Sequence, residues 1–206
     1  MADTSDLNAL VTRNIGDIEA AYTHAVELGA SLMEDIADIL RAELGDSWHV
    51  VVDVDNENVP LWFARRDWLG NDSRSDRDRY SFNFNMKAGP GDEYDHTWLA
   101  SLMNTGPEGA SVAVYFWAST FNGKRRWIRL LEEQKGLVEN LVKVGFKQDT
   151  DRWLYLPFAL DSALLAKGYE AGDITAALKP ARDLASVICG TIKQLETLVV
   201  RDRVFE

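Results

Sequence analysis

PLWFARRDWL at residues 60–69 and YSFNFNMK at residues 80–87 are the two runs that decide the fold. In the second run, aromatic and apolar side chains alternate with polar ones, which include Asn83 and Asn85. Strict alternation is typical of a half-buried antiparallel strand, with one face on the core and the other toward water. The two runs therefore predict the central hairpin of an antiparallel sheet.

Three more strands are predicted around this hairpin, at residues 48–55, 111–118 and 152–158. SVAVYFWA (111–118) is apolar on both faces, which favours a central place in the sheet. Pro157 suits an edge, because proline cannot donate a ladder hydrogen bond. Helices are predicted before, between and after these strands. This order predicts an α+β fold with a mostly antiparallel sheet of about five strands, covered by helices.

Residues 5–44 are predicted to form a long helix whose apolar positions repeat every seven residues. The positions expected to mediate self-association are Val11, Ile15, Ile18, Tyr22, Leu32 and Ile36. Three arrangements fit this pattern: an extended helix that pairs with a second copy, a hairpin that breaks near Gly29, or an amphipathic helix packed on the sheet. A similar repeat over residues 174–199 lets the terminal helices pair with each other, within or between chains.

The charge is unevenly distributed along the chain. Residues 1–60 hold 13 acidic and two basic side chains, which accounts for the whole net charge of −11. We therefore divide the chain into an acidic helical segment (1–46) and an α+β domain (47–206) closed by C-terminal helices. An acidic chain argues against a general nucleic-acid binder.

The expected location is the cytoplasm. No run of apolar residues reaches the roughly 18 that a membrane span needs. MADTSDLNAL at the start of the sequence lacks a basic region followed by an apolar one, so no secretory signal is expected. Cys189 is the single cysteine, which excludes an intramolecular disulfide and fits a reducing compartment.

Four cations mark the start of the helix predicted at residues 124–144: Lys124, Arg125, Arg126 and Arg129. Positive side chains in a first turn oppose the helix dipole, so an anion-binding site is one interpretation. The other interpretation is a solvated helix start neutralised by nearby acids. The Walker spacing is absent, because its glycines and its terminal Lys-Ser/Thr pair are missing.

The connector of the hairpin, GNDSRSDRDR (70–79), is the second candidate contact surface. Arg74, Arg77 and Arg79 are the side chains expected to bind a protein partner. Interleaved aspartates nearly cancel their charge, which makes contact with phosphates less favourable. A surface hairpin without a partner fits the same residues.

The sequence shows no complete catalytic or metal-binding motif. Asp92, Asp95 and His96 belong to the one cluster of histidine and carboxylates, and a turn followed by a helix cap explains them. A metal needs three or four convergent ligands, and no second histidine is near in the sequence. We therefore expect no catalytic residues, no metal and no cofactor.

One stretch, EEQKGLVENLVKVGFKQDTDRWLYLPF (132–158), resembles the helix and "GF…W" strand of accessory domains associated with PD-(D/E)XK (restriction-like) nucleases. The resemblance extends over roughly residues 40–200. Such a nuclease needs an acid-x-Lys triplet on a strand, and Asn85-Met86-Lys87 has an amide where the acid belongs. The resemblance thus implies an accessory or recognition domain without the cleavage site.

The functional hypothesis is a non-enzymatic cytoplasmic binding or regulatory protein that self-associates through its terminal helices. The alternative is a phosphate- or nucleic-acid-binding accessory module of a nuclease system, with its site at Lys124–Arg129. A homo-oligomer, and beyond it a protein partner, are the interactions that this hypothesis predicts, without a membrane.

Overall fold

The computed structural model describes residues 4–53, 56, 58–69, 80–90, 97–105, 111–118 and 124–203. The helices are α1 (Thr4–Arg13), α2 (Ile15–Leu44), α3 (Trp98–Leu102), α4 (Lys124–Glu133), α5 (Lys135–Lys143), α6 (Ser162–Ala171), α7 (Lys179–Arg203) and the short η1 (Arg66–Trp68). The strands are β1 (Trp48–Val52), β2 (Leu61–Arg65), β3 (Phe82–Ala88), β4 (Val112–Ala118), β5 (Lys147–Gln148) and β6 (Leu154–Phe158). The predicted α+β class is confirmed.

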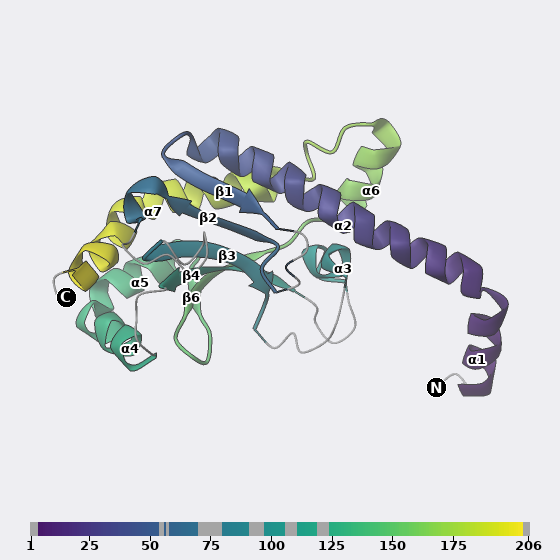
Figure 1. The fold of residues 1–206 in the computed structure, drawn as a ribbon, viewed down its shortest axis with the longest axis horizontal. Helices are drawn as coiled ribbons and strands as arrows, with labels where there is room; N and C mark the ends of the chain where they lie inside the picture. Colours follow the sequence, from purple (N-terminus) through teal and green to yellow (C-terminus); the bar gives the residue numbers. More distant parts are fainter. Residues whose placement is uncertain are drawn as a thin grey trace.

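The six strands form one antiparallel sheet in the order β1-β2-β3-β4-β6-β5. Phe63, Phe84 and Phe116 lie directly opposite one another on β2, β3 and β4. Their rings form a continuous row, in which Phe63 and Phe84 are stacked and Phe116 is tilted by 47° to Phe84. Helices α2 and α7 lie side by side along the sheet and bury this apolar face (Figure 1). The hairpin of β2 and β3 is therefore at the centre of the core, and β4 is central as predicted.

Strand β3 is buried on both faces, so the prediction of a half-buried strand is wrong. Asn83 is 0% exposed and Asn85 is 4% exposed. The physical reason is the size of the neighbours on the same face. Asn85 is paired directly with Trp62 on β2 and with Tyr115 on β4, and both of these rings are themselves buried.

Helix α2 runs unbroken through Gly29, so the predicted alternative of a hairpin at this glycine is wrong. The N-terminal helical region is instead interrupted at Asn14, whose ψ of 16° separates α1 from α2. Gly29 faces α3: a Cβ at this position would lie 3.1 Å from the backbone nitrogen of Leu99. The glycine is thus explained by close packing of α2 on α3 within the chain.

Replacing Gly29 by valine is expected to destabilise the fold by roughly 1–3 kcal/mol, because the added side chain overlaps the backbone of α3. Urea unfolding measures the effect. Gly16→Val is the matched control, since Gly16 is in the same helix and a Cβ there meets nothing within 4 Å. Equal destabilisation by both substitutions would show that helix propensity, rather than contact with α3, explains Gly29.

The second half of α2 belongs to the same core as the sheet. Leu32, Ile36 and Leu40 are fully buried there, and Arg182 of α7 lies 3.9 Å from Glu43 of α2. The boundary predicted near residue 46 therefore does not separate two cores. The pairing of the terminal helices that the sequence suggested occurs within the chain, between α2 and α7.

Local signals in the sequence explain several helix ends. Asp161 caps α6 by accepting hydrogen bonds from the backbone nitrogens of Ala163 and Leu164, at 2.8 and 2.9 Å. Gly172 ends α6 in the left-handed conformation. The helix predicted over residues 124–144 is two helices, because Gln134 interrupts it with non-helical angles. None of the helices that the structure describes is long and apolar enough to cross a membrane.

Candidate functional site

The first half of α2 and all of α1 extend away from the sheet (Figure 1). Of the twelve large apolar side chains that are exposed in the described residues, seven lie in this extension, so the exposed apolar surface is concentrated there. We call them the N-terminal stripe: Leu7, Leu10, Val11, Ile15, Ile18, Tyr22 and Val26. Their exposed fractions range from 38% to 60%.

The stripe follows the period of the helix. On α2, Ile15, Ile18, Tyr22 and Val26 are separated by three or four residues and therefore share one face. The whole stripe includes four of the six positions at which we predicted self-association, namely Val11 on α1 and Ile15, Ile18 and Tyr22 on α2. The other two, Leu32 and Ile36, are 0% exposed and pack inside the chain. Their burial corrects the prediction, because side chains in the intramolecular core are not available to a second copy.

Two of the four cations of the predicted anion site at the start of α4 are paired with carboxylates. Lys124 forms an ion pair with Asp151, and Arg129 pairs with Glu133 at 2.9 Å. Arg126 is partly buried, and Arg125 is exposed without an ion pair to a described residue. Asp151 was missed by the sequence reasoning, because it lies 27 residues away in the β5–β6 turn.

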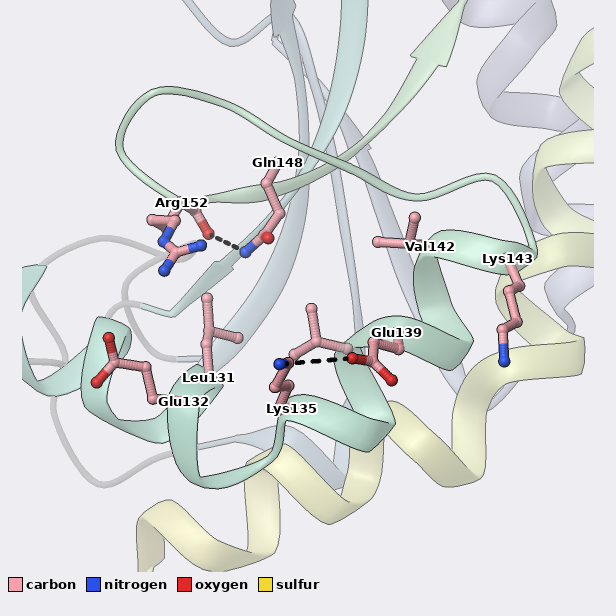
Figure 2. Close-up of a pocket in the computed structure, with 9 residues that line it drawn as sticks. Leu131, Glu132, Lys135, Glu139, Val142, Lys143, Gln148 and Arg152 are labelled. Atoms are coloured by element: carbon pink, nitrogen blue, oxygen red, sulfur yellow. Dashed lines mark hydrogen bonds and ion pairs between the residues drawn. The ribbon is translucent and has the colours of Figure 1, made fainter.

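A groove of about 440 Å³ lies between helices α4 and α5 and the β5–β6 turn (Figure 2). Its apolar side chains are Leu131, Val138 and Val142. Figure 2 shows Gln148 and Arg152 on the wall opposite the helices. The lining residues include no serine, cysteine or histidine.

Charges of both signs surround the groove. Lys135 and Glu139 form an ion pair at 4.0 Å across one turn of α5. Arg152 is in the left-handed conformation, with φ of 68°, and its backbone carbonyl accepts a hydrogen bond from Trp127 Nε1 at 3.1 Å. Trp127 is fully buried, so this contact anchors the turn to the core. The groove was not predicted, because its two walls are joined only by the tertiary fold.

The second face of the sheet combines amides with aromatic rings. We call it the polar face, and its residues are His49, Trp62, Asn83, Asn85, Lys87, Tyr115, Trp117 and Tyr155. Lys87 Nζ lies 4.2 Å from the ring centroid of Tyr115 and 5.3 Å from that of Trp117. Burial of the Tyr115 hydroxyl, with Asp149 and Tyr155 nearby, raises its pKa far above the ordinary value, so the hydroxyl stays protonated.

The described part of the chain holds no group of three or more metal-ligating side chains. Asp92, Asp95 and His96 lie outside the described residues, and so do Arg74, Arg77 and Arg79. Of the other two histidines, His24 is exposed beside Glu27, and His49 Nδ1 shares a hydrogen bond of 2.9 Å with the Tyr80 hydroxyl. Glu133-Gln134-Lys135 has the letters of an acid-x-Lys triplet, but it spans the junction of α4 and α5 rather than lying on a strand.

No protein-family model matches the chain, and neither a curated protein nor a solved structure matches it significantly.

Proposed function

We propose that this chain is a non-enzymatic cytoplasmic binding or regulatory protein that assembles with a second copy of itself through the N-terminal stripe. The observation that carries the proposal is the concentration of exposed apolar side chains on an extension that the chain's own core leaves uncovered. Contiguous exposed apolar surface marks interaction sites in folded proteins. Two copies of one stripe are self-complementary, as a two-fold dimer requires.

The energetic gain from burying the stripe is sufficient for a weak dimer. Each of its side chains is about half exposed, so full burial contributes about 1 kcal/mol per side chain. Two copies together gain on the order of 10 kcal/mol, against roughly 4–15 kcal/mol for the freedom lost on association. The difference leaves at most about 6 kcal/mol, which corresponds to a dissociation constant of tens of micromolar or weaker.

An antiparallel arrangement of the paired helices is the favoured geometry. Packed helices approach to about 8–10 Å, whereas each α2 leads directly into a domain much wider than this spacing. A parallel pair would force the two domains together at one end. An antiparallel pair places them at opposite ends of the helical contact.

Light scattering on the intact chain between low and high micromolar concentration tests the proposal. We expect the mean mass to rise toward twice that of one chain. Four acids and one base lie within residues 4–28, so added salt should strengthen the assembly by screening like charges. A constant monomer mass at all concentrations and salt levels would refute self-association.

The alternative function, binding of phosphate or nucleic acid as an accessory module of a nuclease system, has less support. Two of its four proposed cations are already paired with carboxylates. Its test is salt-sensitive binding of an oligonucleotide that is lost on Arg125→Glu. Salt weakens this contact and strengthens the stripe contact, so the two functions respond in opposite directions.

A further inference from the structure

The groove between α4, α5 and the β5–β6 turn has the size and the apolar lining of a small-molecule site. Its volume of about 440 Å³ lies within the range of roughly 300–1,000 Å³ that ligand pockets span. Leu131 and Val138 are the buried apolar part of the lining, and Val142 is 47% exposed. The groove therefore offers an apolar surface that the chain itself leaves partly uncovered.

The charged side chains that line the groove do not cancel one another. Lys135 pairs with Glu139 at 4.0 Å, whereas Lys143 and Arg152 form no ion pair with any residue that the structure describes. Glu132 is the one other charged side chain of the lining. Two unpaired cations against one carboxylate leave the groove with a positive charge, although the chain as a whole carries −11. The groove therefore favours an anionic ligand over a cationic one.

Arg152 is held in the wall of the groove by its backbone. Its N–H donates a hydrogen bond to the Asp149 carbonyl at 3.0 Å, and its own carbonyl accepts one from Nε1 of the fully buried Trp127 at 3.1 Å. Its φ of 68° lies in the left-handed region, which is unfavourable for a residue other than glycine and is maintained by these contacts. An arginine guanidinium binds a carboxylate through two parallel hydrogen bonds. Arg152 is therefore the best placed of the lining cations to bind a carboxylate.

We propose that this groove binds a small aliphatic carboxylate of the fatty-acid type, with its alkyl chain on Leu131, Val138 and Val142 and its carboxylate on Arg152. Figure 2 shows Arg152 and Lys143 at opposite ends of the lining, so the apolar side chains lie within reach of a positive charge. A ligand with an apolar body and a single anionic head uses both features of the groove, whereas phosphate lacks the apolar body and a hydrocarbon lacks the charge. This site does not depend on assembly through the N-terminal stripe.

Isothermal titration of the intact chain with octanoate, octan-1-ol and octylamine tests the proposal. We expect one octanoate to bind per chain, about tenfold more tightly than octan-1-ol, because hydrogen bonds between charged groups add to the contact of the alkyl chain. Octylamine has an alkyl chain of the same length with a positive head, so it should bind more weakly than either. Equal affinity for octanoate and octylamine, or no saturable binding of octanoate, would overturn the proposal.

Arg152→Gln is expected to weaken octanoate binding about tenfold, because it removes the charged hydrogen bonds to the carboxylate. Arg125→Gln is the matched control, since it removes the same charge from an exposed position on α4 that does not line the groove. It should leave the affinity close to the wild-type value. Equal losses in the two variants would show that overall charge, rather than contact with Arg152, attracts the ligand, which contradicts the proposal.

Val142→Glu tests the apolar part of the site at a position where the fold tolerates a polar side chain. Val142 and Val144 are 47% and 46% exposed, but only Val142 lines the groove, so Val144→Glu is its control. We expect octanoate binding to weaken about tenfold in Val142→Glu, which places a carboxylate against the alkyl chain, and to stay unchanged in Val144→Glu. The double variant Ile15→Glu/Ile18→Glu should also bind octanoate as the wild type does. Unchanged affinity in Val142→Glu, or a loss in the double variant, would place the binding outside the groove and refute the proposal.

Discussion

Replacing Ile15 and Ile18 together by glutamate is expected to make the chain monomeric at every accessible concentration. The two side chains lie at the middle of the N-terminal stripe and are 48% and 42% exposed. Burying four glutamates in a paired interface, two from each copy, would place unpaired charges in apolar surroundings, which costs several kcal/mol. Dimer association should therefore weaken at least a hundredfold, as measured by light scattering or sedimentation.

The same experiment distinguishes assembly from damage to the fold. Both positions lie on the extension rather than in the core, so the urea midpoint of the monomer should stay close to the wild-type value. Leu164→Glu is the control, because Leu164 is 46% exposed on α6, away from the stripe. If Leu164→Glu dissociated the dimer as strongly as the double variant, the contact would not be at the stripe.

Replacing Phe84 by alanine is expected to produce the largest loss of stability among single changes in the sheet, about 3–5 kcal/mol. The ring is fully buried on the central strand β3 and stacks on Phe63 with a centroid separation of 5.1 Å. It also contacts Phe116 at 5.2 Å, so its removal leaves a cavity bordered on both neighbouring strands. Urea unfolding followed by tryptophan fluorescence reports the loss as a lower midpoint.

Tyr169→Ala is the comparison for this change, because it removes an aromatic ring that is 43% exposed on α6. Its cost should be much smaller, since little cavity is formed at a solvated position. If the urea midpoint of Phe84→Ala were as high as that of Tyr169→Ala, the row of Phe63, Phe84 and Phe116 rings would not be central to the core.

Much of the fold could be predicted because its signals are local. Alternation identified β3 as a strand, and apolarity on both faces identified β4 as central in the sheet. These signals depend on neighbours along the chain, so the amino-acid order carries them directly. The interruptions at Asn14 and Gln134 were missed, because neither proline nor a cluster of turn residues marks them.

The candidate sites were less predictable, because each depends on residues far apart in the sequence. Lys124 is neutralised by Asp151 across 27 positions, which no spacing rule indicates. The alternating pattern of β3 predicted that Asn85 faces solvent. In the structure Asn85 lies between Trp62 and Tyr115 on the neighbouring strands. Burial of a polar side chain depends on the size of its cross-strand neighbours, and these come from other strands.

The seven-residue repeat of the N-terminal helix has one property that the sequence determines and one that depends on tertiary packing. The seven-residue repeat by itself predicted that residues 5–44 form an amphipathic helix with one apolar face. It did not determine what covers that face, because Ile15 and Ile36 occupy equivalent positions in the repeat. Only the tertiary structure decided that Ile36 packs under the sheet and α7 while Ile15 remains exposed. The physical reason is that periodicity specifies an apolar surface, whereas the partner that buries it is set by long-range packing.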